Sequence, residues 1–457
     1  MQFDVAIVGA GFAGIACASA LVRRNPALNI VLLDPAAQLP AGLPFAGARP
    51  EHLLNVRADQ MSLDSAQPLH FCDYLGKHDR AQYGDLGSVA IGEVFAPRAL
   101  YCDYVRAVFK QAQHDAAAAG GQVKQVRVQV GEITRVNQHY LIFGKPGDDD
   151  ADDVVQIGAP HVILALGAGE YKSMIKHPLW HVGPWRLNEL PAHTPGDTAL
   201  IIGSGLTGID SAQTLHRLGW RGAIKMLSPN ARLPAANFER ALAIWQLAPD
   251  FVQHCQTPRQ FLQALRAELA RARAVGIDWR AVLNALRSIT TEIFLAWTPR
   301  QRTSVLRRAG SLWGMHRHRM PPSVAALIHA LQFSGKLSLV SGRFIDVTVC
   351  TASALQVRVS AGVGGGAEST QDYALVIDAR GPNYRTADWP VVTKLINAGL
   401  LKASLTGFGL LVDVDGRAGQ QIYALGVLTY GERLETMAVP EIRQQAERIA
   451  ELIIASF

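Results

Sequence analysis

The feature that most constrains the fold is a short apolar run followed at once by closely spaced glycines. Val5–Val8 is long enough for a buried parallel strand, and Gly9, Gly11 and Gly14 then give the spacing G-x-G-x-x-G. A second apolar run ends at Asp34, 20 residues after the last of these glycines. In such units the helix N-terminus holds a pyrophosphate and the acid accepts ribose hydroxyls. The pattern predicts a dinucleotide-binding unit rather than a glycine-rich turn of another α/β fold.

A second copy of the pattern begins about 190 residues further along. It carries Gly203, Gly205 and Gly208, and the strand that follows ends at Ser228 instead of at an acid. Arg232 lies four residues beyond. A missing acid with a nearby arginine favours a 2′-phosphate, and hence NADPH over NADH, although Arg232 could equally be a solvated loop residue.

Composition places the chain among soluble α/β enzymes. Its 457 residues suffice for two or three domains, and 49% hydrophobic and 18% charged residues argue against disorder. The net charge of +6 suits anionic cofactors and substrates and is too dilute for nucleic acid. The start of the chain is no signal peptide, so we expect a cytoplasmic protein that binds no membrane.

The cysteines restrict the chemistry. The five are scattered, which fits a reducing compartment, and none has metal-ligand spacing, so we expect no metal site. The missing C-x-x-C pair argues against a disulfide reductase, because those flavoproteins relay electrons through paired thiols.

The two glycine patterns imply two nucleotide sites and a divided first domain. We expect an α/β protein with two Rossmann-like domains, the second inserted in the first. The first, at residues 1–185 and 340–457, suits FAD. The second, at 190–335, suits NAD(P) and carries a mostly helical insertion at about 238–334. Together the sites predict hydride transfer from NAD(P)H to the flavin.

Several segments besides the glycine patterns resemble bacterial FAD/NAD(P)-binding flavoproteins related to class B flavin monooxygenases, the N-hydroxylating and Baeyer–Villiger enzymes. They are His52–Val56 with Met61 and Ser62, Phe95–Arg98, Leu218–Gly222, Arg317–Arg319 and Ala438–Arg443. The resemblance implies that reduced flavin reacts with oxygen to form a C4a-hydroperoxide, that NADP⁺ stays bound, and that one oxygen atom passes to the substrate. Urate hydroxylation is one activity of this type of flavoprotein, which makes urate a candidate substrate.

The resemblance and the local sequence together suggest roles for individual residues. Asn55 is the candidate for a polar group near the flavin edge, or else a loop residue that caps a turn. Arg317 and His318 are either an anion or substrate contact beside the nicotinamide or part of a basic surface loop. Arg98 is a weaker candidate for the FAD phosphates or an anionic substrate. Gly426 stands at the usual ribityl contact, but valine follows it where related proteins have aspartate.

The main functional prediction is an NAD(P)H-using FAD monooxygenase that hydroxylates a small polar molecule with oxygen. The first alternative is an N-hydroxylase of an amino acid or diamine. Its site should carry acids or amides to hold an amine, and the basic segment 317–319 argues mildly against it. Two further alternatives are a reductase that passes electrons to a partner protein and a nucleotide-binding module that catalyses no reaction. We also expect that the protein could form a homo-oligomer.

Overall fold

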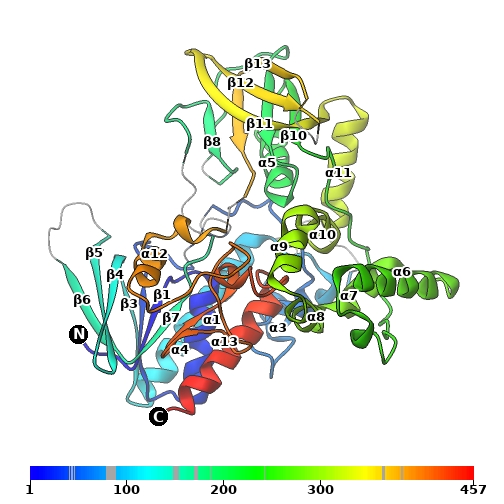
Figure 1. Ribbon diagram of the computed structural model, residues 1–457. Coiled ribbons are helices and arrows are strands. Elements are labelled where there is room, and N and C mark those ends of the chain that lie inside the picture. The colour runs from blue at the N-terminus through cyan, green and yellow to red at the C-terminus, as the bar shows by residue number, and fades with distance from the viewer. Residues whose placement is uncertain are drawn as a thin grey trace.

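A computed structural model describes residues 1–40, 42, 45, 47–78, 89–147, 154–168, 173–185, 187–240, 242–362, 366–381 and 384–457 (Figure 1). The first glycine pattern lies in a six-stranded sheet with the order β15-β16-β7-β1-β2-β3. Its strands are β1 (Val5–Val8), β2 (Asn29–Leu33), β3 (Gln122–Val126), β7 (His161–Leu164), β15 (Arg417–Gly419) and β16 (Ile422–Ala424). All neighbours pair in parallel except β15 and β16.

Both faces of this sheet are covered, as the continuous apolar runs of β1 and β2 require. One face packs against α1 (Phe12–Arg24), α4 (Arg98–Ala118) and α13 (Val439–Ile454). The other face packs against α12 (Pro390–Asn397) and a second, three-stranded sheet. That sheet is an antiparallel meander of β4 (Val128–Val136), β5 (His139–Pro146) and β6 (Val155–Ala159).

The second glycine pattern lies in a seven-stranded sheet with the order β13-β12-β11-β10-β9-β14-β8. Its strands are β8 (Trp180–Val182), β9 (Thr198–Ile202), β10 (Ala223–Ser228), β11 (Leu337–Thr351), β12 (Ala354–Ala361), β13 (Glu368–Tyr373) and β14 (Leu375–Asp378). Helices α5 (Leu206–Arg217) and α11 (Pro322–Phe333) pack on one face. Figure 1 shows this sheet above the first one.

A helical part with its own apolar core lies beside both sheets (Figure 1). Its helices are α6 (Pro258–Ala274), α7 (Trp279–Ala285), α8 (Thr290–Ala296), α9 (Pro299–Arg308) and α10 (Gly310–Arg317). The remaining short helices of the described residues are η1 (Ala58–Gln60), α3 (His70–Gly76), η3 (Ile91–Glu93), η4 (Val252–His254), η5 (Leu286–Ser288), η6 (Thr386–Asp388) and η7 (Gly426–Thr429). None of the described helices is long and apolar enough to cross a membrane.

The sheets confirm the expected fold class, but the boundaries between the two domains differ from those expected. Two mainly parallel sheets, each with its own glycine turn, are present, and the second is inserted in the first; its edge strands β11, β12 and β13 pair antiparallel with one another. The expected boundary at 335–340 is wrong, because β11 pairs in parallel with β10 and the strands up to residue 378 belong to the second sheet. At the other boundary, β8 joins that sheet from residue 180. The expected helical insertion is also shorter, because residues 242–248 are irregular.

Candidate active site

The first glycine turn has a backbone that only glycine can adopt. Gly9 has a φ of +104°, and a Cβ there would lie 2.3 Å from the carbonyl oxygen of Ala165. A Cβ on Gly14 would lie 2.0 Å from the carbonyl oxygen of Gly9, so helix α1 touches the strand at this point. The Ala10 N–H donates to Asp34 Oδ2 over 2.9 Å, which fixes the acid beside the turn.

The edge of the first sheet fits FAD. Gly11 is the N-cap of α1, and no described side chain caps this helix, so its first N–H groups can bind a pyrophosphate. Gly426 lies two residues beyond Ala424, the last residue of β16, with a φ of +67°, and its N–H donates to Gln445 Oε1 over 3.0 Å. In open parallel sheets ligands bind at this edge, and the glycine turn and Asp34 lie there too.

The second glycine turn repeats this geometry. Gly203 has a φ of +114°, and a Cβ there would lie 2.5 Å from the Ala379 carbonyl oxygen. A Cβ on Gly208 would lie 2.2 Å from the Gly203 carbonyl oxygen. A Cβ on Gly205 would meet nothing within 4 Å, which leaves room for a pyrophosphate. The turn opens into a cavity of about 610 Å³, the nucleotide cavity, which Ser228 also lines.

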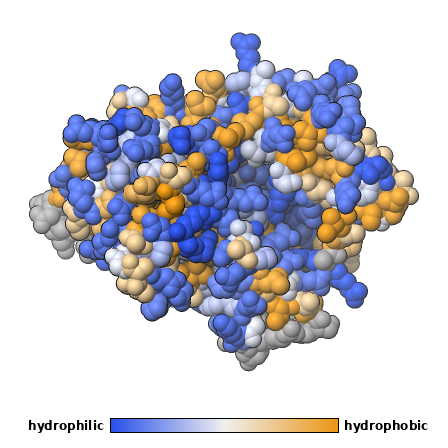
Figure 2. All heavy atoms as spheres, turned by 90° about the horizontal axis from the view of Figure 1, so that it is seen from below, coloured by the Kyte–Doolittle hydropathy of each residue, from blue (hydrophilic) through white to orange (hydrophobic). Residues whose placement is uncertain are grey.

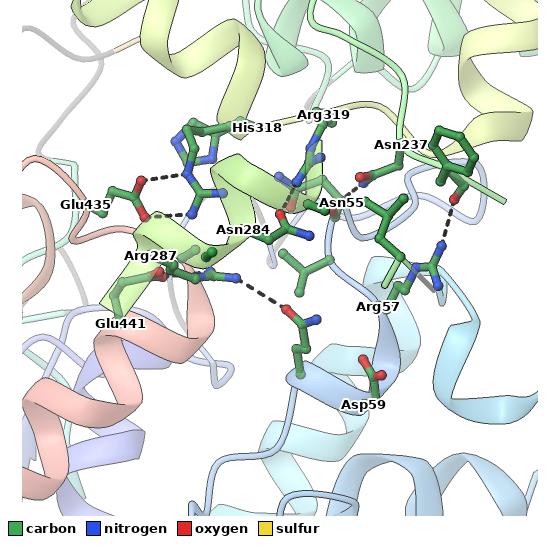
Figure 3. A pocket seen from close by; sticks show the side chains of 18 of the residues that line it. Asn55, Arg57, Asp59, Asn237, Asn284, Arg287, His318, Arg319, Glu435 and Glu441 are labelled. Atoms are coloured by element: carbon green, nitrogen blue, oxygen red, sulfur yellow. Dashed lines mark hydrogen bonds and ion pairs between the residues drawn. The ribbon is translucent and has the colours of Figure 1, made fainter. Parts of the chain in front are cut away.

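A second cavity of about 550 Å³ lies where the first unit meets the helical part (Figure 3). We call it the central cavity. Residues 55–60 and 434–441 form one side, and residues 237–238, residues 242–245, helix α7 and residues 317–319 form the other. Its volume suits a small molecule. Figure 2, seen from below, shows a hollow in the surface with mainly hydrophilic residues inside it.

Most charges in the central cavity are paired. Its charged lining residues are Arg57, Arg287, Arg317, Arg319, Asp59, Glu435 and Glu441. Arg317 makes two bonds to Glu435, of 2.5 and 2.7 Å, and both side chains are below 10% exposed. Arg287 pairs with Glu441 at the start of α13. Arg57 pairs with Glu93 over 3.4 Å and donates to the Phe238 carbonyl.

Two charged side chains of opposite sign remain without an ion pair of their own. Arg319 is 5% exposed, and only its Nη2 donates, to Asn284 Oδ1. Its Nε and Nη1 are buried and have no hydrogen-bond partner among the described residues. Burial, together with the nearby Arg317 and Arg280, lowers the pKa of Arg319 to about 9. The site therefore holds a buried cation that lacks an anion.

The second unpaired charge is Asp59 on η1. Its Oδ1 is buried and accepts no hydrogen bond from the described residues. Burial raises the pKa of this carboxyl, although Arg57 opposes the shift. With Glu93 included, the cavity has four arginines and four carboxylates, so its charges balance. A ligand with one positive and one negative group would complement Asp59 and Arg319.

His318 lines both cavities. Burial, and secondarily the adjacent Arg317, lowers its pKa, so the imidazole is neutral at pH 7. Asn55 lines the central cavity, and its carbonyl accepts from Asn237 Nδ2 over 3.2 Å. The candidates Asn55, Arg317 and His318 thus all line the central cavity, although Arg317 is neutralised by Glu435.

Two other candidates lie elsewhere. Arg98 pairs with Asp210 of α5 over 2.9 Å and lies at the contact between the two units, where its charge is already engaged. This position does not support its suggested role at the FAD phosphates. The Arg232 side chain is exposed and does not line the nucleotide cavity; its carbonyl accepts from Ser204 Oγ over 2.6 Å.

Comparison with known families bears on the first unit. A family model described as FAD-NAD(P)-binding matches residues 6–169. These residues form an FAD/NAD(P)-binding domain. No protein of curated function matches the sequence.

Solved structures share the fold of the whole chain. Reduced ornithine hydroxylase PvdA from Pseudomonas aeruginosa is 17% identical, with a TM-score of 0.64 over 100% of this chain and 99% of the other. Ornithine N-hydroxylase KtzI from Kutzneria sp. 744, with reduced FAD, NADP⁺ and L-ornithine, is 12% identical, with a TM-score of 0.63 over 100% of both chains. The cadaverine monooxygenase DfoA from Erwinia amylovora, bound to FAD, is 13% identical, with a TM-score of 0.64 over 100% and 95%. The FAD/NAD(P)-binding domain thus belongs to a two-unit fold that N-hydroxylating flavoproteins also have.

The sequence did not identify Asp59 as a candidate site residue, and it did not distinguish the role of Arg319 from that of Arg317. Asp59 lies two residues after Arg57 in a sequence segment without periodicity, so no pattern marked it. Arg317 and Arg319 look alike in sequence. Their difference comes from Glu435, which is 118 positions from Arg317.

Proposed function

We propose that the protein is an FAD-dependent, NADPH-using monooxygenase that hydroxylates the nitrogen of a small substrate with both an amino and an anionic group. The observation that carries this proposal is a pair of oppositely charged side chains in the central cavity, Arg319 and Asp59, which have no ion pair among the described residues and keep buried atoms without a hydrogen-bond partner. Fold likeness to ornithine and cadaverine hydroxylases supports the amine alternative, and no comparison supports urate.

The cavity meets the requirement for an amine site. Acids and amides line it, among them Asn55, Asp59, Asn237 and Asn284. The basic segment 317–319, which argued against an amine, loses one of its charges to Glu435. Arg319 alone remains to bind an anion, such as a carboxylate, through its free Nε and Nη1.

The reaction balances with the cofactors that the fold accommodates. One atom of O₂ forms the N–O bond, the other leaves as water, and NADPH supplies the two electrons. Bound FAD supplies the redox chemistry with oxygen. The chain's own part is to hold the anionic end on Arg319, orient the amine towards Asp59 and the amides, and exclude water. Neutral His318 stands in the wall between the two cavities.

The test uses the FAD-loaded protein with NADPH and four compounds: L-ornithine, L-lysine, cadaverine and urate. We expect oxygen uptake and a product heavier by one oxygen atom with an amino acid, and a weaker reaction with cadaverine, which has no anion for Arg319. Urate should give no product.

Other outcomes reject the proposal. Product from urate alone restores the urate hydroxylase hypothesis. Rapid flavin reduction and reoxidation with no product from any compound indicates a reductase that serves a partner. No flavin reduction by either NADPH or NADH indicates a nucleotide-binding module.

A further inference from the structure

The nucleotide cavity contains an arginine that the sequence patterns did not mark. Ser228 ends strand β10, and its partner in the neighbouring parallel strand β11 is Ser341. Arg343 lies two residues further along β11 and lines the cavity together with Ser228. It therefore sits beyond the carboxyl end of β10, on the side where a Rossmann-like unit binds the ribose of its nucleotide.

The residue that ends β10 carries no negative charge that would repel a phosphorylated ribose. Where an acid would accept the 2′-hydroxyl of NADH, the chain has Ser228, whose Oγ is buried and has no hydrogen-bond partner among the described residues. A hydroxyl at this point can donate to a ribose or phosphate oxygen.

Three arginines are candidates for binding a 2′-phosphate, and they differ in their positions and contacts. Arg232 lies outside the cavity lining. Arg380 is engaged: it makes bonds of 2.9 and 2.7 Å to Asp378 and lies 4.6 Å from the ring centre of Phe344. The Arg343 side chain is exposed and makes no hydrogen bond or ion pair with another described residue.

We propose that Arg343, and not Arg232, binds the 2′-phosphate and makes the second nucleotide site selective for NADPH. The inference rests on the proposed function in that the site must hold a nicotinamide dinucleotide. A guanidinium suits this task because its planar fork of N–H groups matches phosphate oxygens. Because Arg343 is free, binding the phosphate breaks no internal ion pair.

The test measures equilibrium binding to the FAD-loaded protein by calorimetry, without oxygen or an amine substrate. The ligand pairs are NADP⁺ with NAD⁺, and 2′,5′-ADP with 5′-AMP, which differ by the 2′-phosphate. Arg343→Ala should weaken NADP⁺ and 2′,5′-ADP roughly 10- to 100-fold and leave NAD⁺ and 5′-AMP unchanged. Arg343→Lys should recover part of the loss. Arg232→Ala is the matched control and should change neither pair.

The proposal is wrong if Arg343→Ala leaves the NADP⁺-to-NAD⁺ affinity ratio unchanged, or if Arg232→Ala removes it. It is also wrong if the unmodified protein binds NAD⁺ as tightly as NADP⁺. Since binding is measured without turnover, failure to hydroxylate an amine would leave this result standing, and failure here would leave the hydroxylation assay unaffected.

Discussion

Replacement of Arg319 by methionine tests whether the central cavity is built for an anion. The guanidinium is 5% exposed, and two of its three nitrogens have no hydrogen-bond partner among the described residues. Burial and the nearby Arg317 and Arg280 lower its pKa to about 9, well below the ordinary value for arginine. At about 1.4 kcal/mol per pH unit, this fall corresponds to at most about 5 kcal/mol of unfavourable energy for the charge in the empty site.

Arg319→Met should therefore leave the empty protein as stable as before or more so. Replacing buried charges with apolar side chains of similar size often stabilises a protein by about 1–4 kcal/mol. The affinity for the substrate should fall instead. Removing one partner of a buried charge pair costs about 2–5 kcal/mol, so the KM for an amino-acid substrate should rise at least about 30-fold. The KM for cadaverine, which has no anionic group, should change little.

Arg317→Met is the matched control. It removes a guanidinium from the same segment but leaves Glu435 buried without its partner, and it should lower the free energy of unfolding by about 3–5 kcal/mol. The assay compares urea unfolding midpoints of the FAD-loaded variants and their steady-state KM values. The reasoning fails if Arg319→Met destabilises the protein as much as Arg317→Met, or if the KM for every amino acid is unchanged.

Three further predictions concern other parts of the structure. Gly203→Ala should abolish flavin reduction by NADPH but retain the flavin spectrum and reduction by dithionite, because the new Cβ would collide with the Ala379 carbonyl of the second unit only. Glu432→Gln should lower the free energy of unfolding by about 3–5 kcal/mol in urea titrations, since Arg302 is left buried without a charge partner. Burial lowers the pKa of His318, so below pH 6.5 the unfolded chain binds a proton more readily than the folded one. Stability should thus fall as the pH drops from 7.5 to 5.5, and by less in His318→Gln.

Much of the fold follows from local sequence. Each glycine turn involves a strand, three glycines and a helix that adjoin in the chain. The steric need for glycine at Gly14 and Gly208 arises within the turn itself, because a Cβ there would collide with the carbonyl oxygen of Gly9 or Gly203. The covered strands appear as continuous apolar runs because parallel sheets are buried on both faces. For these reasons the two units, their order and their nucleotide-binding character were predictable.

The division between the units was not predictable in the same way. Strands β11–β14 follow the helical part in sequence, and their short alternating patterns fit either sheet. Their membership depends on pairing with β10 and β9, more than 100 residues earlier. Pairing over such distances is decided by packing and not by local propensity.

The sequence by itself determined two dinucleotide units, because their turns are encoded by neighbouring residues. The tertiary structure alone decided which charges are free to bind a ligand. Arg98, Arg317 and Arg319 are equally basic in sequence, but Asp210 and Glu435, each more than 100 positions away, neutralise the first two. Arg319 is buried without a carboxylate partner, because long-range packing determines which charges meet.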